Sequence, residues 1–406
     1  MSAVLTAPVR LSTPTRAIPA AAGPGREPVR LSSLDVLRGA TVAAMVLVND
    51  PAMGPPYLYH QLTHSVWDGW TFADTIYPAF LFMVGMALPF SMSRHLDGRL
   101  ARWRALPRIA RRTILLFALG LLVNGFPLLL GEHESVLGHL RIPGVLQRIA
   151  IAYLLGAVIV VYLRPRYQIL VTIGLLLGYW AGLEWISVPH FGAGALSPHG
   201  NLAAFVDRSI FGPAHMYGSG TLGYDPEGLL GSVVATAGVL AGSWAGTLMR
   251  ARRPMAVTFS ALASAGMAAI GLGYLWGRVL PINKRMWTPS YVLLMSGLAL
   301  AALAVCHLLF DRPGRPAAWS SVPLRVLGTN AIVIYVGSEL TAAALGRYHH
   351  AVAGIPNAPI PFWIWARYLV PHFGLRGGAL AYAAAILAGW WVVLAVLYRL
   401  GLFVKV

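Results

Sequence analysis

Uninterrupted apolar runs of about 20 residues recur along this chain, and they constrain its fold more than any other feature. Each run is long enough to cross the roughly 30 Å hydrocarbon core of a bilayer as an α-helix. Hydrophobic residues make up 57% of the chain and charged residues only 11%, against about 25% charged residues in a soluble domain. The segments of about ten alternating residues that mark a transmembrane β-barrel do not occur. The sequence therefore predicts an all-α polytopic membrane protein.

We expect about ten transmembrane helices in one bundle. The predicted spans are 34–50, 72–92, 109–130, 144–163, 167–188, 228–249, 255–276, 288–310, 324–345 and 378–401. The short aromatic segment 362–370 is interpreted as an interfacial or re-entrant helix. Residues 1–30 lack an apolar core, so they are interpreted as a disordered cytoplasmic tail in front of a membrane domain at 31–406.

The net charge of +17 comes mainly from arginines in the loops between the spans. Most of these arginines fall in loops on one side of the predicted topology, so the positive-inside rule places both termini in the cytoplasm. The loop that carries His64 has no Lys or Arg and is predicted to face outward. Because the arginines are not interleaved with aromatic residues along one face, we expect no nucleic-acid partner. The single cysteine, Cys306, excludes an intrachain disulfide. His349 and His350 lack a third ligand at useful spacing, so no metal is expected.

Several titratable and amide side chains gather where the first two spans meet the predicted outer face. His64 is suited to act as a general base or briefly as a nucleophile, although a loop histidine that only caps the second span fits the sequence too. Asp68 and Asp74 can orient the imidazole or bind a cationic amine, and Asp74 can equally be a helix cap. Asn49 can hold a carbonyl oxygen or simply end the first span. The cluster predicts an active site.

Other polar residues fall at the same predicted depth. Arg148 lies inside a span, where a guanidinium needs a partner, and the outer carboxylates are the candidates. It is either a substrate ligand or part of a structural ion pair. Asp225 and Glu227 begin the sixth span, as the helix dipole favours. Asn283 and Lys284 begin the eighth, where a lysine opposes the dipole preference and so indicates a function.

A second polar group lies toward the predicted inner face. Asp35 and Arg38 begin the first span, and Arg325 and Asn330 lie at the start of the ninth. Arginines at a pocket mouth suit a phosphate-rich cytosolic ligand, whereas Asp35 with Arg38 is also explained by an i,i+3 ion pair. Polar clusters at both faces of one bundle predict a reaction with one substrate from each side.

Several segments together resemble a known family. They are Leu34-Asp-Val-Leu-Arg-Gly39, Val48-Asn49, His64-x-x-Trp67-x-Gly69-x-Thr-x-Ala-Asp74, Pro78-x-Phe80-x-Phe82-x-x-Gly85, Leu140-Arg-Ile-Pro-Gly-Val-Leu-Gln-Arg148, Asp225-Pro-Glu-Gly-Leu-Leu230, Asn283-Lys284-x-x-Trp287-x-x-Ser290-Tyr291 and Gly328-x-Asn330. The chain resembles the heparan-α-glucosaminide N-acetyltransferase family and its bacterial relatives, within the wider transmembrane acyltransferase group. Only a 30-residue tail precedes the first span, where the lysosomal relatives have a large luminal domain and an additional span.

The resemblance implies that residues 31–406 form a transmembrane acyltransferase domain. Acetyl-CoA is then the donor from the cytosol, and an amino sugar is the acceptor across the membrane. The histidine matching His64 is catalytic in that family, with the asparagine matching Asn49 beside it. Trp67, Arg148 and Lys284 are expected to contact the sugar, together with Asp225, Glu227 and Asn283.

We therefore predict an N-acetyltransferase of the bacterial inner membrane, with a glucosamine-type amine or a glycan as the acceptor. A homodimer is an expectation from the resemblance alone. Two alternatives stay open. One is a transporter or flippase for a sugar or a lipid-linked sugar, which usually shows internal repeats and broken spans. The other is an O-acyltransferase of envelope glycans, which differs only in its acceptor.

Overall fold

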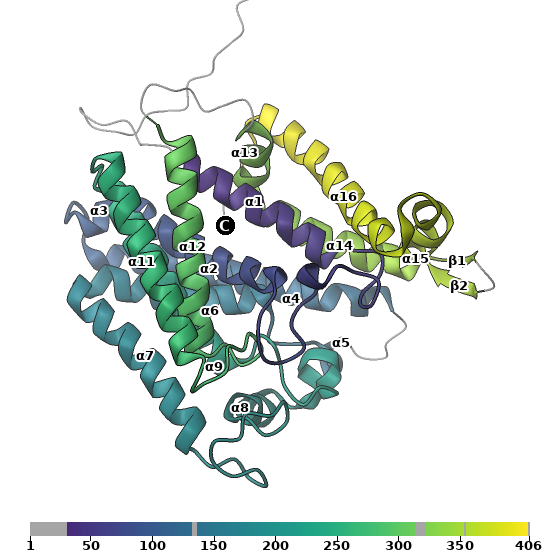
Figure 1. Cartoon of the computed structure of the whole chain (residues 1–406), viewed down its shortest axis with the longest axis horizontal. Coiled ribbons are helices and arrows are strands. Elements are labelled where there is room, and N and C mark those ends of the chain that lie inside the picture. Colours follow the sequence, from purple (N-terminus) through teal and green to yellow (C-terminus); the bar gives the residue numbers. More distant parts are fainter. Residues whose placement is uncertain (1–30, 132–135, 313–320, 353–354, 405–406) are drawn as a thin grey trace, which may run out of the picture. The chain divides into compact units, whose positions relative to one another are not determined.

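The computed structural model describes residues 31–131, 136–312, 321–352 and 355–404. The tail predicted at 1–30 lies outside the described residues. The described chain is mostly helical, as the sequence predicts (Figure 1). It is a multi-pass membrane protein by the length and composition of its helices.

Eight helical segments in the described ranges are long and apolar enough to cross a membrane. They are α2 (Phe72–Ser91), Arg102–Leu130 with α4 (Leu106–Leu130), α6 (Val145–Tyr162), α7 (Pro165–Trp185), Leu229–Arg250 with α9 (Leu229–Val234) and α10 (Thr236–Arg250), α11 (Met255–Trp276), α12 (Pro289–Phe310), and Ile360–Arg399 ending in α16 (Val370–Arg399). Several other described helices are short: α3 (Ser93–Leu96), α5 (Val136–His139), α8 (Leu202–Phe211) and 3-10 turns at His60–Leu62, Pro213–His215 and Tyr217–Gly220.

Two further helical regions were predicted as spans but are not among these eight. Helix α1 (Ser32–Asn49) matches the predicted span 34–50 but is not among the eight, because Asp35, Arg38 and Asn49 make it more polar. Helices α13 (Val322–Thr329) and α14 (Ala331–Arg347) pass the same test only as a pair bent by 78°. The described chain thus has eight or nine candidate spans, and the expected number of about ten is not confirmed. The positions of the termini relative to the membrane are likewise not confirmed.

The predicted span 324–345 is broken at Asn330. The Asn330 side chain is fully buried, donates to the Leu402 carbonyl and accepts from the Val404 backbone N–H at 3.1 and 2.9 Å. These bonds tie the break to the end of α16. Predicted segment 362–370 is helical as well, formed by α15 (Ile360–Ile364), a π-helical turn at Trp365–Leu369 and the start of α16.

An antiparallel pair of short strands precedes α15 and was not predicted. It consists of β1 (His349–Val352) and β2 (Ile355–Pro359). In Figure 1 this pair lies beside α15 and the adjoining end of α16. The residues involved include prolines and adjacent histidines, and their sequence carries no clear alternation that would have indicated strands.

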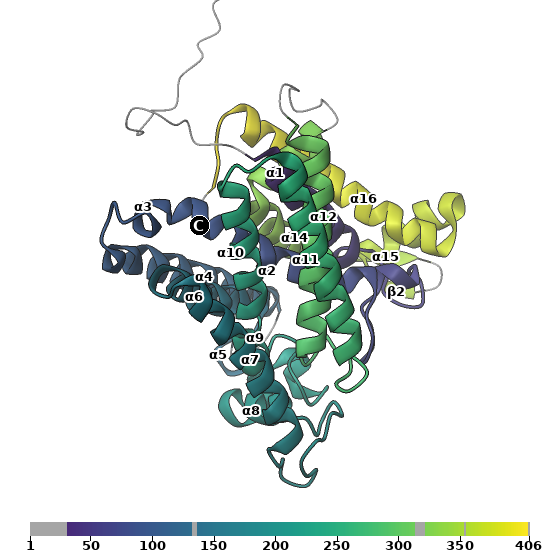
Figure 2. The same cartoon turned by 60° about the vertical axis from the view of Figure 1, so that its left-hand side comes forward.

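Small residues let the central helices pack closely. A side-chain carbon added at Gly85 of α2 would lie only 1.8 Å from the Val239 carbonyl oxygen of α10. The same addition at Gly242 of α10 would lie 1.9 Å from the Phe82 carbonyl oxygen of α2. Backbones that approach this closely are typical of helix pairs in membranes. Helices α11 and α12 run side by side in both views (Figures 1 and 2).

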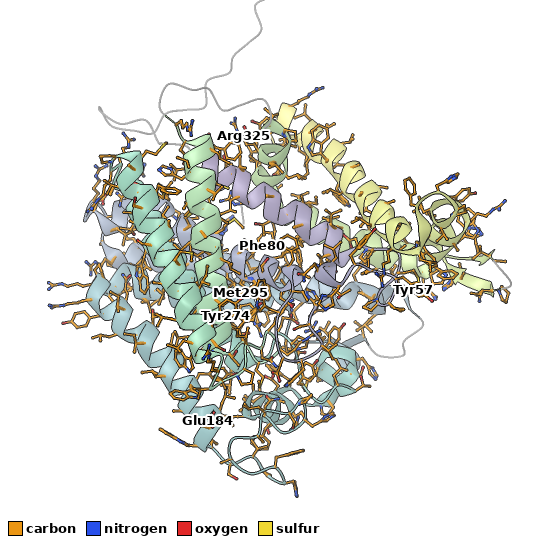
Figure 3. All side chains as sticks on the ribbon, viewed as in Figure 1. Tyr57, Phe80, Glu184, Tyr274, Met295 and Arg325 are labelled. Atoms are coloured by element: carbon orange, nitrogen blue, oxygen red, sulfur yellow. The ribbon has the colours of Figure 1, made fainter. Side chains whose placement is uncertain are left out.

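Arg325 and Glu184 mark the two ends of the described helix bundle. Figure 3 shows Arg325 of α13 and Glu184 of α7 toward opposite ends of the described helices, with Phe80 of α2 between them. Long segments connect the helices at 50–71, 186–228 and 277–288, and each of them supplies a residue to the candidate site.

Candidate functional site

Asp74 joins a loop to the first turn of α2. Its Oδ2 accepts from the backbone N–H groups of Ser65 and Thr71 at 3.1 and 3.0 Å, and from the Thr71 hydroxyl at 3.2 Å. A carboxylate at the third helical position commonly satisfies free N–H groups at a helix start in this way. The contacts fix the loop that carries His64 onto the rigid end of α2.

The other oxygen of Asp74 faces the candidate catalytic groups. Asp74 Oδ1 lies 2.9 Å from His64 Nδ1 and 3.2 Å from Lys284 Nζ. The Lys284 nitrogen is also 3.0 Å from His64 Nδ1 and 3.4 Å from Nε2. Asp74 is completely buried and Lys284 nearly so. One carboxylate therefore combines the two interpretations that the sequence left open, helix cap and partner of His64.

Asp68 does not share this arrangement. Its Oδ1 accepts from Asn283 Nδ2 at 3.1 Å, and Asn283 Oδ1 accepts from the Met286 backbone N–H at 2.8 Å. The Gly69 N–H donates to the Ile282 carbonyl oxygen at 2.8 Å, with Gly69 at a φ of +90° that favours glycine. These bonds join the His64 loop to the Lys284 loop, so Asp68 and Asn283 hold the geometry of the site without lining it.

The surroundings of His64 favour its neutral form. Burial lowers the pKa of the imidazole, and the positive charges of Lys284 and Arg285 lower it further against the opposing effect of Asp74. Burial also lowers the pKa of the Lys284 amine. In the tautomer whose Nδ1–H donates to the carboxylate, the Nε2 lone pair is the proton acceptor. A histidine oriented by an aspartate in this way can act as a general base.

Arg141, and not Arg148, forms ion pairs with the carboxylates Asp225 and Glu227. Its guanidinium donates to Asp225 Oδ2 and Oδ1 at 3.0 and 2.6 Å, and to Glu227. Burial alone would raise the pKa of Glu227, but Arg141, Arg148 and Lys284 together hold it below its usual value. The prediction of a direct carboxylate partner for Arg148 is therefore corrected. Arg141 precedes α6 and lies against the loop that carries Asp225 and Glu227, so its guanidinium reaches both carboxylates.

Arg148 is instead enclosed by neutral groups. Its guanidinium donates to the Pro226 carbonyl oxygen at 2.8 Å and to Ser232 Oγ at 3.3 Å, and it lies 4.4 Å from the centre of the Trp287 ring. The side chain is 1% exposed and does not line the cavity described below. These contacts indicate a structural residue that supports the Glu227 loop.

Replacing Arg141 by methionine is expected to lower the free energy of unfolding by about 3–5 kcal/mol, because Asp225 and Glu227 would be left buried without their partner. Thermal unfolding of the purified protein measures this effect. Arg347→Met, at an exposed position near the end of α14, is the matched control and should unfold close to the wild type. Equal melting temperatures of the two variants would contradict the role given to Arg141.

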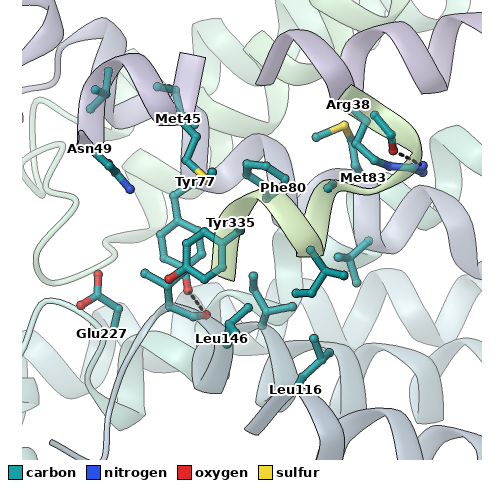
Figure 4. Close-up of a pocket in the computed structure, with 18 of the residues that line it drawn as sticks. Arg38, Met45, Asn49, Tyr77, Phe80, Met83, Leu116, Leu146, Glu227 and Tyr335 are labelled. Carbon is teal, nitrogen blue, oxygen red and sulfur yellow. Dashed lines mark hydrogen bonds between the residues drawn. The ribbon is translucent and has the colours of Figure 1, made fainter. Parts of the chain in front are cut away.

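A cavity of about 490 Å³ connects the two predicted polar groups. His64, Lys284, Glu227 and Asn49 line it together with Arg38, Arg112 and many apolar side chains. In Figure 4, Asn49 and Glu227 lie on one side of the cavity and Arg38 on the other, with Tyr77 and Phe80 between them. Its volume is in the range of small-molecule sites.

Asn49 and His64 line the same cavity, but the Asn49 amide donates to Glu339 Oε1 at 3.3 Å. Glu339 belongs to α14 and was not predicted. An intramembrane carboxylate inside an apolar run was the available signal.

The residues predicted to bind the acetyl donor do not all line this cavity. Arg38 lines the cavity. Its Nη1 lies 3.6 Å from Asp35 Oδ1 and donates to the Gly328 carbonyl oxygen at 3.3 Å. Asp35, Arg325 and Asn330 do not line it. Arg112 of α4 does line it, although it was not among the residues predicted to bind the acetyl donor. Its Nε is buried without a hydrogen-bond partner among the described residues, while the guanidinium lies 4.6 Å from the Tyr153 ring centre.

Trp67 also lies outside the cavity lining. Its Nε1 donates to the Leu196 carbonyl oxygen at 3.0 Å, and its ring packs edge-on against Tyr224 with 4.9 Å between ring centres. The indole thus fastens the His64 loop to the long loop after α7. These contacts of Trp67 hold two loops together and do not involve the cavity.

Comparison with known proteins gives the same family as the sequence motifs. Residues 30–204 match the family description "Heparan-alpha-glucosaminide N-acetyltransferase, catalytic". The human protein of that name is 30% identical over 361 residues, which cover 77% of this chain and 53% of the relative. The mouse protein is 28% identical over 383 residues, covering 81% of this chain and 57% of the relative.

The predicted resemblance to the heparan-α-glucosaminide N-acetyltransferase family is confirmed. The matched region 30–204 contains Asn49, His64 and Asp74, whereas Lys284 lies in the part of the chain reached only by the longer alignments. The chain spans about half the length of the curated relatives it matches.

Proposed function

We propose that this chain is an integral-membrane acetyltransferase that moves an acetyl group from acetyl-CoA to the amine of a glucosamine-type sugar. The observation that carries the proposal is one cavity lined by His64 and Lys284, both of which contact Asp74, and also by Arg38 and Arg112. The names of the curated relatives support acetyl transfer as the reaction. Transfer of radiolabel from acetyl-CoA to glucosamine by the purified protein tests it.

The chemistry follows from the orientation of His64. Its Nε2 takes a proton from the acceptor amine as the amine nitrogen attacks the acetyl carbonyl carbon. The carbon–sulfur bond then breaks, and the thiolate leaves and receives the proton from the imidazolium. Asp74 stabilises the imidazolium in between, and the Asn49 amide donates to the carbonyl oxygen as negative charge develops.

A covalent route uses the same groups. His64 Nε2 would attack the acetyl carbonyl, the thiolate would leave, and the acetyl group would pass from the imidazole to the amine. Rapid quenching with labelled acetyl-CoA in the absence of acceptor separates the two routes. Label retained on the protein and lost in His64→Ala indicates the covalent route, and no label indicates direct transfer.

Arg38 and Arg112 are the proposed ligands of the donor's phosphate groups. The buried Arg112 Nε, which has no hydrogen-bond partner in the described part of the chain, fits a phosphate oxygen as its acceptor. We place the donor on the cytosolic side of a bacterial inner membrane and the acceptor on the periplasmic side, with both termini cytoplasmic. Glu227 and Lys284, which line the cavity near Asn49, are the proposed contacts of the amino sugar. Asp225, Asn283, Arg148 and Trp67 position them from outside the cavity.

Arg112→Ala is expected to raise the KM for acetyl-CoA about 10- to 100-fold with little change in kcat, since a charge-assisted hydrogen bond contributes about 1.5–3 kcal/mol. Steady-state kinetics with varied acetyl-CoA measures the two constants. Arg111→Ala is the control, because Arg111 is the exposed neighbour and does not line the cavity. A large fall in kcat at unchanged KM would contradict phosphate binding by Arg112.

The lowered pKa of His64 predicts the pH dependence of transfer. A base must be neutral to accept a proton, and a free histidine protonates near pH 6.5. Because burial lowers the pKa in the folded protein, the neutral form persists below that value. We expect kcat/KM to stay level as pH falls to about 6.5 and to decline only at lower pH. A decline centred above pH 7 would contradict this environment for His64.

The bend of 78° between α13 and α14 favours a transporter as the second candidate, because transporters build substrate sites at broken helices. Binding of CoA separates the two functions. An enzyme of the proposed kind is stabilised against heat by CoA, whereas a sugar transporter is indifferent to it. O-acylation of a glycan differs only in the acceptor, so a panel of amino sugars and their N-acetylated forms distinguishes it.

A further inference from the structure

A second cavity, of about 430 Å³, lies on the other side of Asn49. It is formed between the end of α1 and helices α14, α15 and α16, which adjoin one another in Figure 1. Its lining includes Asn49, Asp50, Ala342, Leu345, Phe362 and Tyr382. The reaction proposed above uses none of them except Asn49.

Asp50 is the charged residue in this lining. Its side chain is 4% exposed, and its Oδ2 is buried with no hydrogen-bond partner among the described residues. The neighbours that act on this carboxylate are Glu339, which is also acidic, and the Ser338 hydroxyl. A buried carboxylate normally needs a positive partner or a full set of hydrogen bonds. The described lining includes no Lys, Arg or His to supply one.

The remaining walls suit a mainly apolar ligand. Most lining side chains are aliphatic, aromatic or proline. The Thr341 hydroxyl already donates to the Gly337 carbonyl oxygen at 2.7 Å, and the Ser338 hydroxyl donates to the Tyr335 carbonyl oxygen at 3.3 Å. A sugar with several hydroxyl groups would therefore lose more hydrogen bonds to water than it gains here.

We propose that this cavity binds an amphipathic primary amine, with the ammonium group on Asp50 and the apolar body against Phe362, Tyr382 and Leu345. The ammonium supplies both the positive charge and the hydrogen-bond donor that Asp50 Oδ2 lacks. The site is distinct from the His64 cavity and shares only Asn49 with it. The proposal does not depend on acetyl transfer.

The test is equilibrium binding of n-hexylamine to the purified full chain in detergent at pH 7, by calorimetry, with n-hexanol as the uncharged analogue. We expect hexylamine to bind about tenfold more tightly than hexanol, or better, and Asp50→Asn to remove that preference. Glu184→Gln, a carboxylate that lines neither cavity, should bind as the wild type does. Equal affinities of amine and alcohol for the wild type would overturn the proposal.

Two further arms keep the test independent of the folding of one variant. Ala342→Leu reduces the cavity while keeping Asp50, and it should weaken hexylamine binding about tenfold or more through overpacking. Glucosamine should fail to displace hexylamine, because the cavity lacks free polar groups for its hydroxyls. Displacement by glucosamine, or unchanged binding by both variants, would overturn the assignment.

Discussion

His64→Ala is expected to lower the rate of acetyl transfer to glucosamine about 10²- to 10⁴-fold, the usual loss when a general base is removed. Asp74 contacts His64 Nδ1, so Nε2 is the nitrogen that would take the proton of the amine. The His64 side chain is about one-third exposed, and Lys284 remains as a partner of the buried Asp74 when the imidazole is removed. Thermal unfolding of the variant should therefore stay close to that of the wild type. Radiolabel transfer measures the rate.

His60→Ala is the matched control for this variant. His60 lies in the same loop, is exposed, and does not line the cavity. We expect its transfer rate to equal that of the wild type within about twofold, as for a surface substitution without special contacts. Full activity in a folded His64→Ala protein would exclude both the base and the acetyl-histidine routes.

Asp74→Asn should reduce transfer about as severely, by about 10²- to 10⁴-fold, for a different reason. The amide can offer an N–H to His64 Nδ1, which would place the ring proton on Nε2 and remove the acceptor lone pair. It also removes the negative charge between His64 and Lys284. An amide oxygen can still accept from the Ser65 and Thr71 N–H groups, so the helix start is largely kept.

Asp68→Asn is the comparison for Asp74→Asn, because the sequence alone does not distinguish the roles of the two aspartates. Asp68 contacts Asn283 rather than His64, so its loss should act only through the position of the Lys284 loop. We expect a smaller fall in transfer for Asp68→Asn than for Asp74→Asn in kinetics at saturating acetyl-CoA. A larger fall for Asp68→Asn would show that the orientation of His64 depends on Asp68.

The helices were largely predictable because the signal for a membrane helix is local. Runs such as 72–92 and 255–276 contain the apolar length that a span requires, and α2 and α11 follow them within a few residues. The break at Asn330 was not predictable in the same way. The break depends on hydrogen bonds between Asn330 and residues Leu402 and Val404, about seventy positions further along the chain.

The candidate site shows the same division between local and distant information. The residue types were present in the motifs, and the pairing of His64 with Asp74 spans only ten positions. The approach of Lys284 to His64 joins loops 220 positions apart, which a single sequence does not reveal. Arg141 and Arg148 are seven positions apart in one motif, and only the fold shows which one reaches Asp225.

The central claim is that one cavity carries acetyl transfer between opposite sides of the membrane. It is tested most directly in sealed vesicles that contain the reconstituted protein, with glucosamine trapped inside and labelled acetyl-CoA outside. We predict labelled N-acetylglucosamine inside the vesicles, at a rate that falls to background with His64→Ala. Product that forms only when donor and acceptor share one side would contradict the account.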